Sequence, residues 1–183
     1  MISGRACSSL DAMVLRGLKA ALPGRNNVVT SACTVGAPAS SNGQLVMLSV
    51  SSFNFRLMMF IQFDTTEAVR AHLAHRSNVE LEQFEEQAFR DAISECGNLA
   101  CGSLNRDLGS VFTHVGMSTP NIIDCACLRH LEFVRHGYLR HFELEIDHHL
   151  RFHASACFCE HENIDFSFEQ TEDAAEGGEL ELF

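Results

Sequence analysis

The chain has 183 residues and a formal net charge of −11; 46% of its residues are hydrophobic and 20% are charged. This composition is typical of soluble globular proteins and excludes wholesale disorder. The longest apolar run, residues 57–61, has five residues, far fewer than the roughly 18 that a membrane-spanning helix needs. We therefore expect a single globular domain and no membrane span.

The negative charge is concentrated at the C-terminal end. Residues 160–183 hold nine acidic residues and no Lys or Arg, and the rest of the chain has 15 acidic against 13 basic residues. We expect a domain over residues 1–169 and a solvated acidic tail over residues 170–183. The nearly neutral body lacks the basic surface of nucleic-acid-binding proteins, so no nucleic-acid partner is predicted.

The eight cysteines do not indicate a secreted, disulfide-bonded protein. Asp11, Arg16 and Lys19 interrupt the first 22 residues, so the continuous apolar core of a secretory signal is missing. The sequence therefore predicts a cytoplasmic location and free thiols.

Hydrophobic periodicity predicts an α+β fold. Period-2 alternation is cleanest from Phe53 to Phe63, with Arg56 and Gln62 on the opposite face. Strands with one buried face favour a largely antiparallel sheet covered by helices. The expected helices are 9–22, with a start near Ser8, 65–75 and 79 to about 101–104; the expected strands are 28–35, 45–50, 53–63, 111–116, 142–146, 150–158 and 164–168.

The third predicted helix carries an unusual polar stripe. At about 100° per residue, Asp91, Glu95, Asn98 and Gly102 fall within an arc of roughly 60°. The apolar residues lie outside that arc, between about 80° and 220°; they are Phe89, Ala92, Ile93, Cys96, Leu99, Ala100 and Leu104. The stripe is therefore expected to face solvent.

Exposed acidic residues are also what an ordinary solvated helix face displays, and that interpretation stays open; two features weigh against it. Gly97 and Gly102 each cost about 1 kcal/mol relative to alanine in a helix, and Asn98 is also a poor helix former. Broken local rules often mark a functional site. Both glycines would let the backbone of a binding partner approach closely.

The pattern Asp91-x3-Glu95-x2-Asn98 followed by Pro120 resembles the (D/S)-x3-E-x2-N-x22-P signature of the CheC/CheX/FliY family. Those proteins are phosphatases of phosphorylated CheY-type response regulators in chemotaxis and two-component signalling. Here 21 residues separate Asn98 from Pro120, one fewer than in the signature. Residues 116–123 also resemble the loop and apolar run after the CheX proline. A single motif makes the chain most similar to CheX.

The resemblance implies a role for each motif residue. Asn98 would orient a water molecule toward the aspartyl phosphate, and Glu95 would pair with a lysine of the receiver domain. Asp91 and Pro120 would be structural, and Gly102 would be a third supporting residue beside them. The receiver would carry the Mg²⁺, so no cofactor or metal site of the protein's own is implied. The resemblance also implies a homodimer.

Two other kinds of site remain as alternatives. Cys157-x-Cys159-x-His161 and Cys125-x-Cys127 have spacings that could hold a metal, because alternate residues of a strand share one face. Buried free cysteine, however, also behaves as a small hydrophobe. The histidines at 136, 141, 148, 149 and 153 are individually typical of surface or half-buried positions, and a Cys96 nucleophile would lie on the apolar arc of its helix.

A non-catalytic relative is the main alternative function. The same fold family includes flagellar-switch components that bind regulators without the catalytic pair. Glu95 and Asn98 are both present here, which favours the enzyme, whereas the shortened spacing leaves a receiver-binding adaptor open.

Overall fold

The computed structural model describes residues 1–22, 28–32, 44–146 and 150–168. Its elements, in chain order, are α1 (Gly4–Ala21), β1 (Val28–Ala32), β2 (Gln44–Ser51), β3 (Phe55–Phe63), α2 (Glu67–Arg76), the 3₁₀ helix η1 (Leu81–Gln83), α3 (Glu86–Gly109), β4 (Gly116–Met117), β5 (Asn121–Asp124), the 3₁₀ helix η2 (Cys125–Phe133), β6 (Tyr138–Ile146) and β7 (Leu150–Glu160). None of the helices among the described residues is both long and apolar enough to span a membrane.

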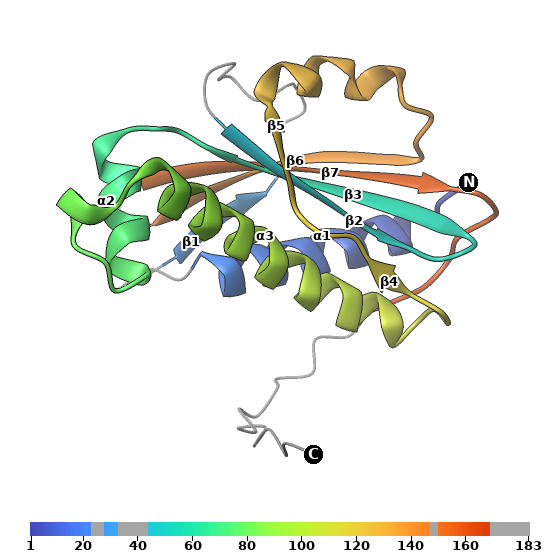
Figure 1. The fold of residues 1–183 in the computed structure, drawn as a ribbon. Coiled ribbons are helices and arrows are strands. Elements are labelled where there is room, and N and C mark those ends of the chain that lie inside the picture. Colours follow the sequence, from blue (N-terminus) through green and yellow to red (C-terminus); the bar gives the residue numbers. More distant parts are fainter. Residues whose placement is uncertain (23–27, 33–43, 147–149, 169–183) are drawn as a thin grey trace.

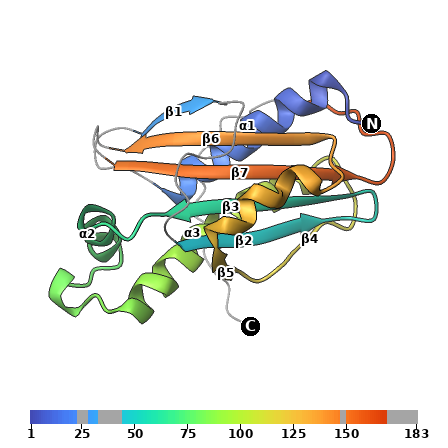
Figure 2. The ribbon, with the colours of Figure 1, turned by 90° about the horizontal axis from the view of Figure 1, so that it is seen from above.

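The strands form one antiparallel sheet. Its order is β1-β6-β7-β3-β2-β4, and β5 pairs with β2 on the same edge as β4. Each pairing between these strands is antiparallel. Figures 1 and 2 show the long strands β2, β3, β6 and β7 side by side. The predicted α+β fold with a largely antiparallel sheet is confirmed.

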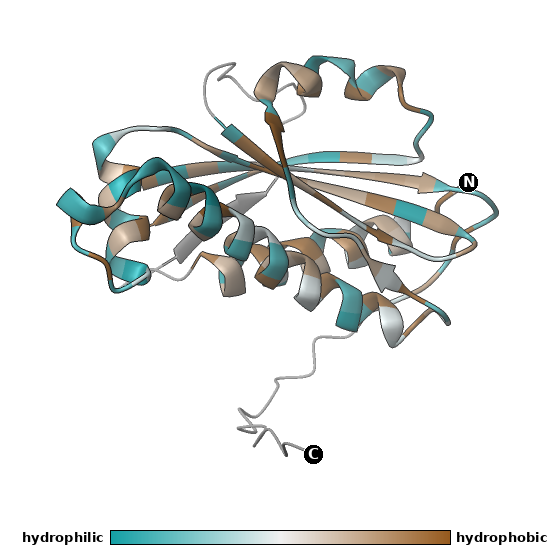
Figure 3. Ribbon diagram, viewed as in Figure 1, coloured by the Kyte–Doolittle hydropathy of each residue, from teal (hydrophilic) through white to brown (hydrophobic). Residues whose placement is uncertain are grey.

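Helices cover both faces of this sheet. α1 and α3 lie together on one face, where they run in opposite directions, and η2 lies over the other face (Figure 1). The main core fills the space between the sheet and the α1–α3 pair. A second core under η2 consists of Leu45, Phe60, Cys125, Leu128, Leu131 and Cys157. In Figure 3 the central strands are mostly hydrophobic, while α3 carries both hydrophobic and hydrophilic residues along its length.

The first helix begins earlier than predicted. Its N-cap is Ser3, whose hydroxyl accepts a hydrogen bond from the amide of Ala6 at 3.1 Å, so the predicted start near Ser8 is wrong. The helix packs so closely on α3 that a Cβ atom on Gly17 would lie only 2.7 Å from the carbonyl oxygen of Ala100. A glycine at this position lets the two backbones touch.

Three further predictions need correction. The predicted strand 111–116 is wrong for most of its length. Turns follow the end of α3 there, and the amide of Phe112 donates to the carbonyl of Leu108 at 2.8 Å. In the predicted strand 164–168, only Ile164 makes a bridge, with Ile2. Phe53 lies outside β3 and is 70% exposed, so it does not share the buried face of that strand. Residues 33–35 of the predicted strand 28–35 lie outside the described residues.

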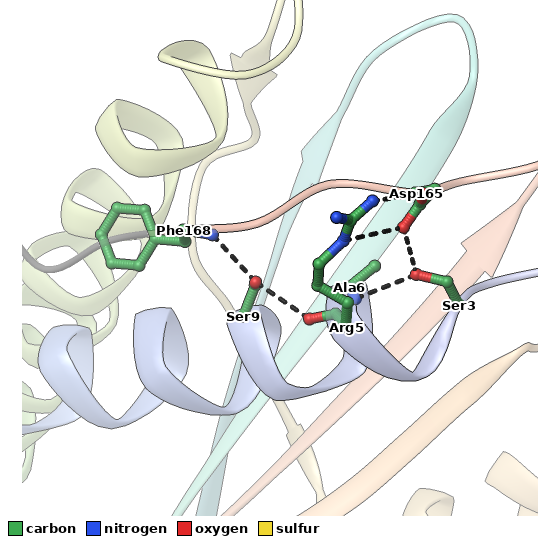
Figure 4. Close-up of polar contacts among 6 residues, drawn as sticks. All are labelled: Ser3, Arg5, Ala6, Ser9, Asp165 and Phe168. Carbon is green, nitrogen blue, oxygen red and sulfur yellow. Dashed lines mark hydrogen bonds and ion pairs between the residues drawn. The ribbon is translucent and has the colours of Figure 1, made fainter.

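The end of the described chain runs alongside the first turns of α1 (Figure 4). Asp165 accepts a hydrogen bond from the Ser3 hydroxyl at 2.6 Å and forms an ion pair with Arg5 at 2.6 Å. The Phe168 amide donates to the Ser9 hydroxyl at 2.9 Å. Residues 161–168 are therefore held against the domain rather than belonging to a solvated tail. The predicted tail, 170–183, lies outside the described residues.

Candidate functional site

The polar stripe lies on α3, a helix of 24 residues. Its opposite face is anchored in the main core, and the helix contacts α1, β2 and the edge strands β4 and β5. The buried apolar side chains of α3 are Phe89, Ile93, Cys96, Ala100, Cys101, Leu104 and Leu108. Because this face is fixed, the orientation of the opposite face is fixed as well.

The stripe faces away from the core, as predicted. Asp91 and Glu95 are exposed, and Asn98 and Gly102 are partly exposed. Neighbours three or four residues apart on a helix have Cβ atoms about 5–6 Å apart, so Glu95 and Asn98 present their side chains together. Within the described part of the chain, neither of these two side chains has a hydrogen bond or ion pair. Both are thus available to a binding partner.

Asp91 differs from this pair because it has a local partner. Its carboxylate accepts a hydrogen bond at 2.8 Å from the side-chain amide of Gln87, one helical turn earlier. This contact holds the carboxylate along the helix surface. Its role in function stays a prediction.

Gly97 serves the packing of the fold. It is buried, and a Cβ atom there would lie 2.5 Å from Leu48 Cδ1 and 3.1 Å from Val46 Cγ2 on β2. The expectation that Gly97 admits the backbone of a partner is therefore wrong: the glycine admits the side chains of the protein's own sheet.

We expect Gly97→Val to lower the free energy of unfolding by about 1–3 kcal/mol, because the larger side chain overpacks the contact with Leu48 and Val46. Chemical denaturation of the variant and the wild type measures this difference. Unchanged stability would show that β2 accommodates the added side chain without strain.

Leu99 departs from the predicted apolar arc. It directly follows Asn98 and is 40% exposed, so it borders the stripe instead of packing in the core. In the sequence, its exposure could have been inferred from its angular position, because Leu99 lies at the edge of the apolar arc nearest Glu95.

Pro120 lies in an irregularity of the sheet edge beside α3. β4 and β5 pair with β2 in registers that differ by one residue, so Leu48 and Ser49 of β2 face three residues, Ser118, Thr119 and Pro120. This is a β-bulge, and proline is tolerated there because it has no amide hydrogen to pair. Ser118 closes the bulge: its amide donates to the Ser49 carbonyl at 2.9 Å, and its hydroxyl accepts from the Ser49 amide at 3.0 Å.

The cysteine pairs lie in or beside the second core. Cys125 and Cys127 belong to η2 and not to a strand as the spacing argument assumed, while Cys157 and Cys159 lie on β7. Burial raises the pKa of Cys157 to about 12 and that of Cys125 to about 11. Across the described residues, no three His, Cys, Asp or Glu side chains are arranged to hold a metal ion.

The histidine and Cys96 candidates do not form a catalytic arrangement among the described residues. His141 lies 2.8 Å from the Ser155 hydroxyl, and His148 and His149 are outside the described residues. Cys96 is buried against the guanidinium of Arg76, and desolvation raises the pKa of its thiol to about 11. A reactive cysteine needs a lowered pKa and solvent access, so Cys96 does not have the properties of a nucleophile.

No protein-family model and no curated protein matches the sequence. Solved structures do match the fold. The CheX chain in a CheX–CheY–BeF₃–Mg²⁺ complex from Borrelia burgdorferi has a TM-score of 0.61 and 14% identity, over 82% of this chain and 95% of that one. A CheC-like protein from Shewanella oneidensis has a TM-score of 0.57 and 12% identity, with coverage of 80% and 95%. CheX from Vibrio vulnificus has a TM-score of 0.56 and 14% identity, over 80% of this chain and 94% of that one.

These likenesses extend over nearly the whole length of each solved chain, at identities that establish the fold alone. In this chain, α3 on one face of the antiparallel sheet carries Glu95 and Asn98 on its outer surface. The chain has the CheC/CheX-type fold.

Proposed function

We propose that the protein is a phosphatase that hydrolyses the aspartyl phosphate of a CheY-type receiver domain in chemotaxis or two-component signalling. The observation that carries the proposal is the placement of Glu95 and Asn98. They lie side by side on the outer face of α3 in a CheC/CheX-type fold, Glu95 exposed and Asn98 partly exposed, and neither has a partner among the described residues. A pair displayed in this way can enter the active site of another protein.

The proposed role of Asn98 follows from the chemistry of the substrate. In aspartyl-phosphate hydrolysis, a water oxygen forms a new bond to phosphorus as the bond from phosphorus to the carboxylate oxygen breaks. The carboxylate leaves with the electron pair, and the protons of the water pass to the phosphate and the solvent. A side-chain amide can both donate to and accept from water without carrying charge. Asn98 would hold the water in line with the breaking bond.

Glu95 would fix the orientation of the partner. It lies one turn before Asn98 on the same face, and its carboxylate would pair with a lysine near the phosphoryl group of the receiver. The charge-assisted hydrogen bond would align Asn98 with the phosphorus atom. Asp91 adds a second negative charge next to Glu95 and so favours a basic partner surface.

The Mg²⁺ in this proposal belongs to the receiver. It would neutralise charge on the phosphoryl oxygens, and the protein would bring no cofactor of its own. The similar CheX chain from B. burgdorferi was solved together with CheY, BeF₃ and Mg²⁺, which supports a CheY-like partner for this chain. A cytoplasmic location, predicted from the N-terminal sequence, and a homodimer, implied by the family resemblance, are part of the proposal.

The test is the rate at which a phosphorylated, Mg²⁺-loaded receiver loses its phosphate with and without the protein. The proposal predicts acceleration that rises with protein concentration and saturates. Binding without acceleration would replace the phosphatase with a receiver-binding adaptor. Neither binding nor acceleration across a panel of receivers would contradict both functions.

A further inference from the structure

Gly102 has no packing reason to be glycine. Apart from its chain neighbours and the backbone of its own helix, a Cβ atom there would have no atom within 4 Å, whereas a Cβ on Gly17 would strike the backbone of α3 and one on Gly97 would strike β2. Glycine in the middle of a helix is unfavourable relative to alanine. The interior of the protein explains the other two glycines but leaves Gly102, inside α3, without an internal cause.

Leu99 is a second residue that the fold does not explain. It stands one turn before Gly102, next to Asn98, with 40% of its surface exposed. Elsewhere on α3 the leucines are buried: Leu104 and Leu108 have no exposed surface. A partly exposed leucine is ordinary by itself, but this one borders the side chains proposed to act on the substrate.

Helical geometry places these two residues together. Gly102 follows Leu99 by three positions and Asn98 by four, so the three lie on adjacent turns of one face. The surface there is an exposed apolar side chain followed by bare helix backbone, with the polar pair Glu95 and Asn98 at its N-terminal end. Glu95 is also four positions before Leu99, which completes a compact patch.

We propose that Leu99 and Gly102 form the docking floor for the receiver domain, so that they set the affinity for the partner while Asn98 sets the rate of hydrolysis. This inference rests on the proposed function. The missing side chain of Gly102 lets the backbone of a receiver loop lie against α3, and Leu99 packs against apolar side chains beside the phosphorylated aspartate. The acidic side chains of Asp91 and Glu95 lie on the N-terminal side of this floor and match a partner with a basic residue near its phosphoryl group.

The experiment uses the full chain and a receiver activated with beryllium fluoride and Mg²⁺. Leu99→Ala is expected to weaken binding about five- to tenfold, as judged from the apolar surface that the partner would cover. Gly102→Ala is expected to weaken binding at least tenfold. In the dephosphorylation assay, both substitutions should raise KM and leave kcat within about twofold of the wild type.

The melting temperature of Gly102→Ala is a second readout, because a glycine needed for the fold would give a less stable variant when replaced. Replacing glycine by alanine inside a helix should raise the melting temperature, by about 2–4 °C for a domain of this size. We expect a protein that is more stable and binds more weakly. Gly4→Ala is the matched control, because Gly4 also lies in a helix and a Cβ atom on it would have no atom within 4 Å apart from its chain neighbours and its own helix backbone; it should leave binding unchanged. Phe133→Ala is the control for an exposed apolar side chain, 77% exposed on η2.

The outcomes separate the two proposals. If the wild type binds and acts on the receiver but Leu99→Ala and Gly102→Ala match it in affinity and KM, the docking floor is wrong and the phosphatase stands. If the variants lose kcat with KM unchanged, the assignment to docking is likewise wrong. If the wild type neither binds nor acts on any receiver, both proposals fail.

Discussion

Asn98→Ala is expected to lower the phosphatase rate constant about a hundredfold while the receiver still binds. A hundredfold loss corresponds to about 2.7 kcal/mol of transition-state stabilisation, which one well-placed amide can supply in a site closed off from solvent by the partner. Asn98 is partly exposed and makes no hydrogen bond within the described part of the chain. Its removal should therefore leave the fold intact. Single-turnover kinetics with saturating protein measures the rate constant directly.

Asn105 provides the matched control for this prediction. It lies two turns further along α3, and its side-chain oxygen has no hydrogen-bond partner among the described residues. Asn105→Ala makes the same chemical change on the same helix, about 10 Å along the axis from Asn98. It should leave the rate unchanged. Equal losses in both variants would mean that the effect arises from the helix as a whole and not from water orientation at Asn98.

Asp107→Ala is expected to lower the free energy of unfolding by about 3 kcal/mol, which corresponds to about 6–12 °C in melting temperature. The Asp107 side chain is 2% exposed and forms an ion pair with Arg16, whose Nε also donates to Asp107 at 3.1 Å. The guanidinium lies 5.3 Å from the centre of the Phe168 ring. Removing the carboxylate abolishes both contacts between Arg16 and Asp107 in the buried region where α1 meets α3.

An exposed ion pair provides the contrast. Arg5 and Asp165 form an ion pair whose side chains are 63% and 55% exposed, so solvent screens their interaction. Asp165→Ala should therefore shift the melting temperature far less than Asp107→Ala. Differential scanning calorimetry of both variants makes the comparison, and similar shifts would contradict the importance of burial at Asp107.

The sequence was informative where a periodic pattern was long. The outward orientation of Asp91, Glu95 and Asn98 could be predicted because the opposite face of α3 repeats apolar residues along most of the helix. Most of β6 and β7 could be predicted for the same reason, since apolar residues alternate over 142–146 of β6 and 150–158 of β7. In each case burial of one face determines where the other face lies.

Features that depend on pairing between distant segments could not be predicted. The buried position of Gly97 depends on Leu48 and Val46 of β2, which lie far earlier in the chain. The bulge at Pro120 depends on the registers in which β4 and β5 pair with β2. Local periodicity carries no information on which strand a helix will cross or in which register two strands pair.

The covering helix η2 was missed for a different reason. The segment Cys125–Phe133 is short, and its buried residues, Cys125, Leu128 and Leu131, repeat every three residues, as in a 3₁₀ helix. The second face of the sheet was expected to be polar because Arg56 and Gln62 lie on it. Phe60 and Cys157 on that face are instead buried in the second core, beneath η2.

The structure of a complex between this protein and a receiver carrying beryllium fluoride and Mg²⁺ would test the central claim most directly. The measured quantity is the distance from the side-chain amide of Asn98 to the beryllium fluoride group. The account predicts that α3 enters the active site of the receiver, with Asn98 one water molecule away from that group and Glu95 paired with a lysine. A receiver bound to another face of the protein, with Asn98 still exposed to solvent, would contradict it.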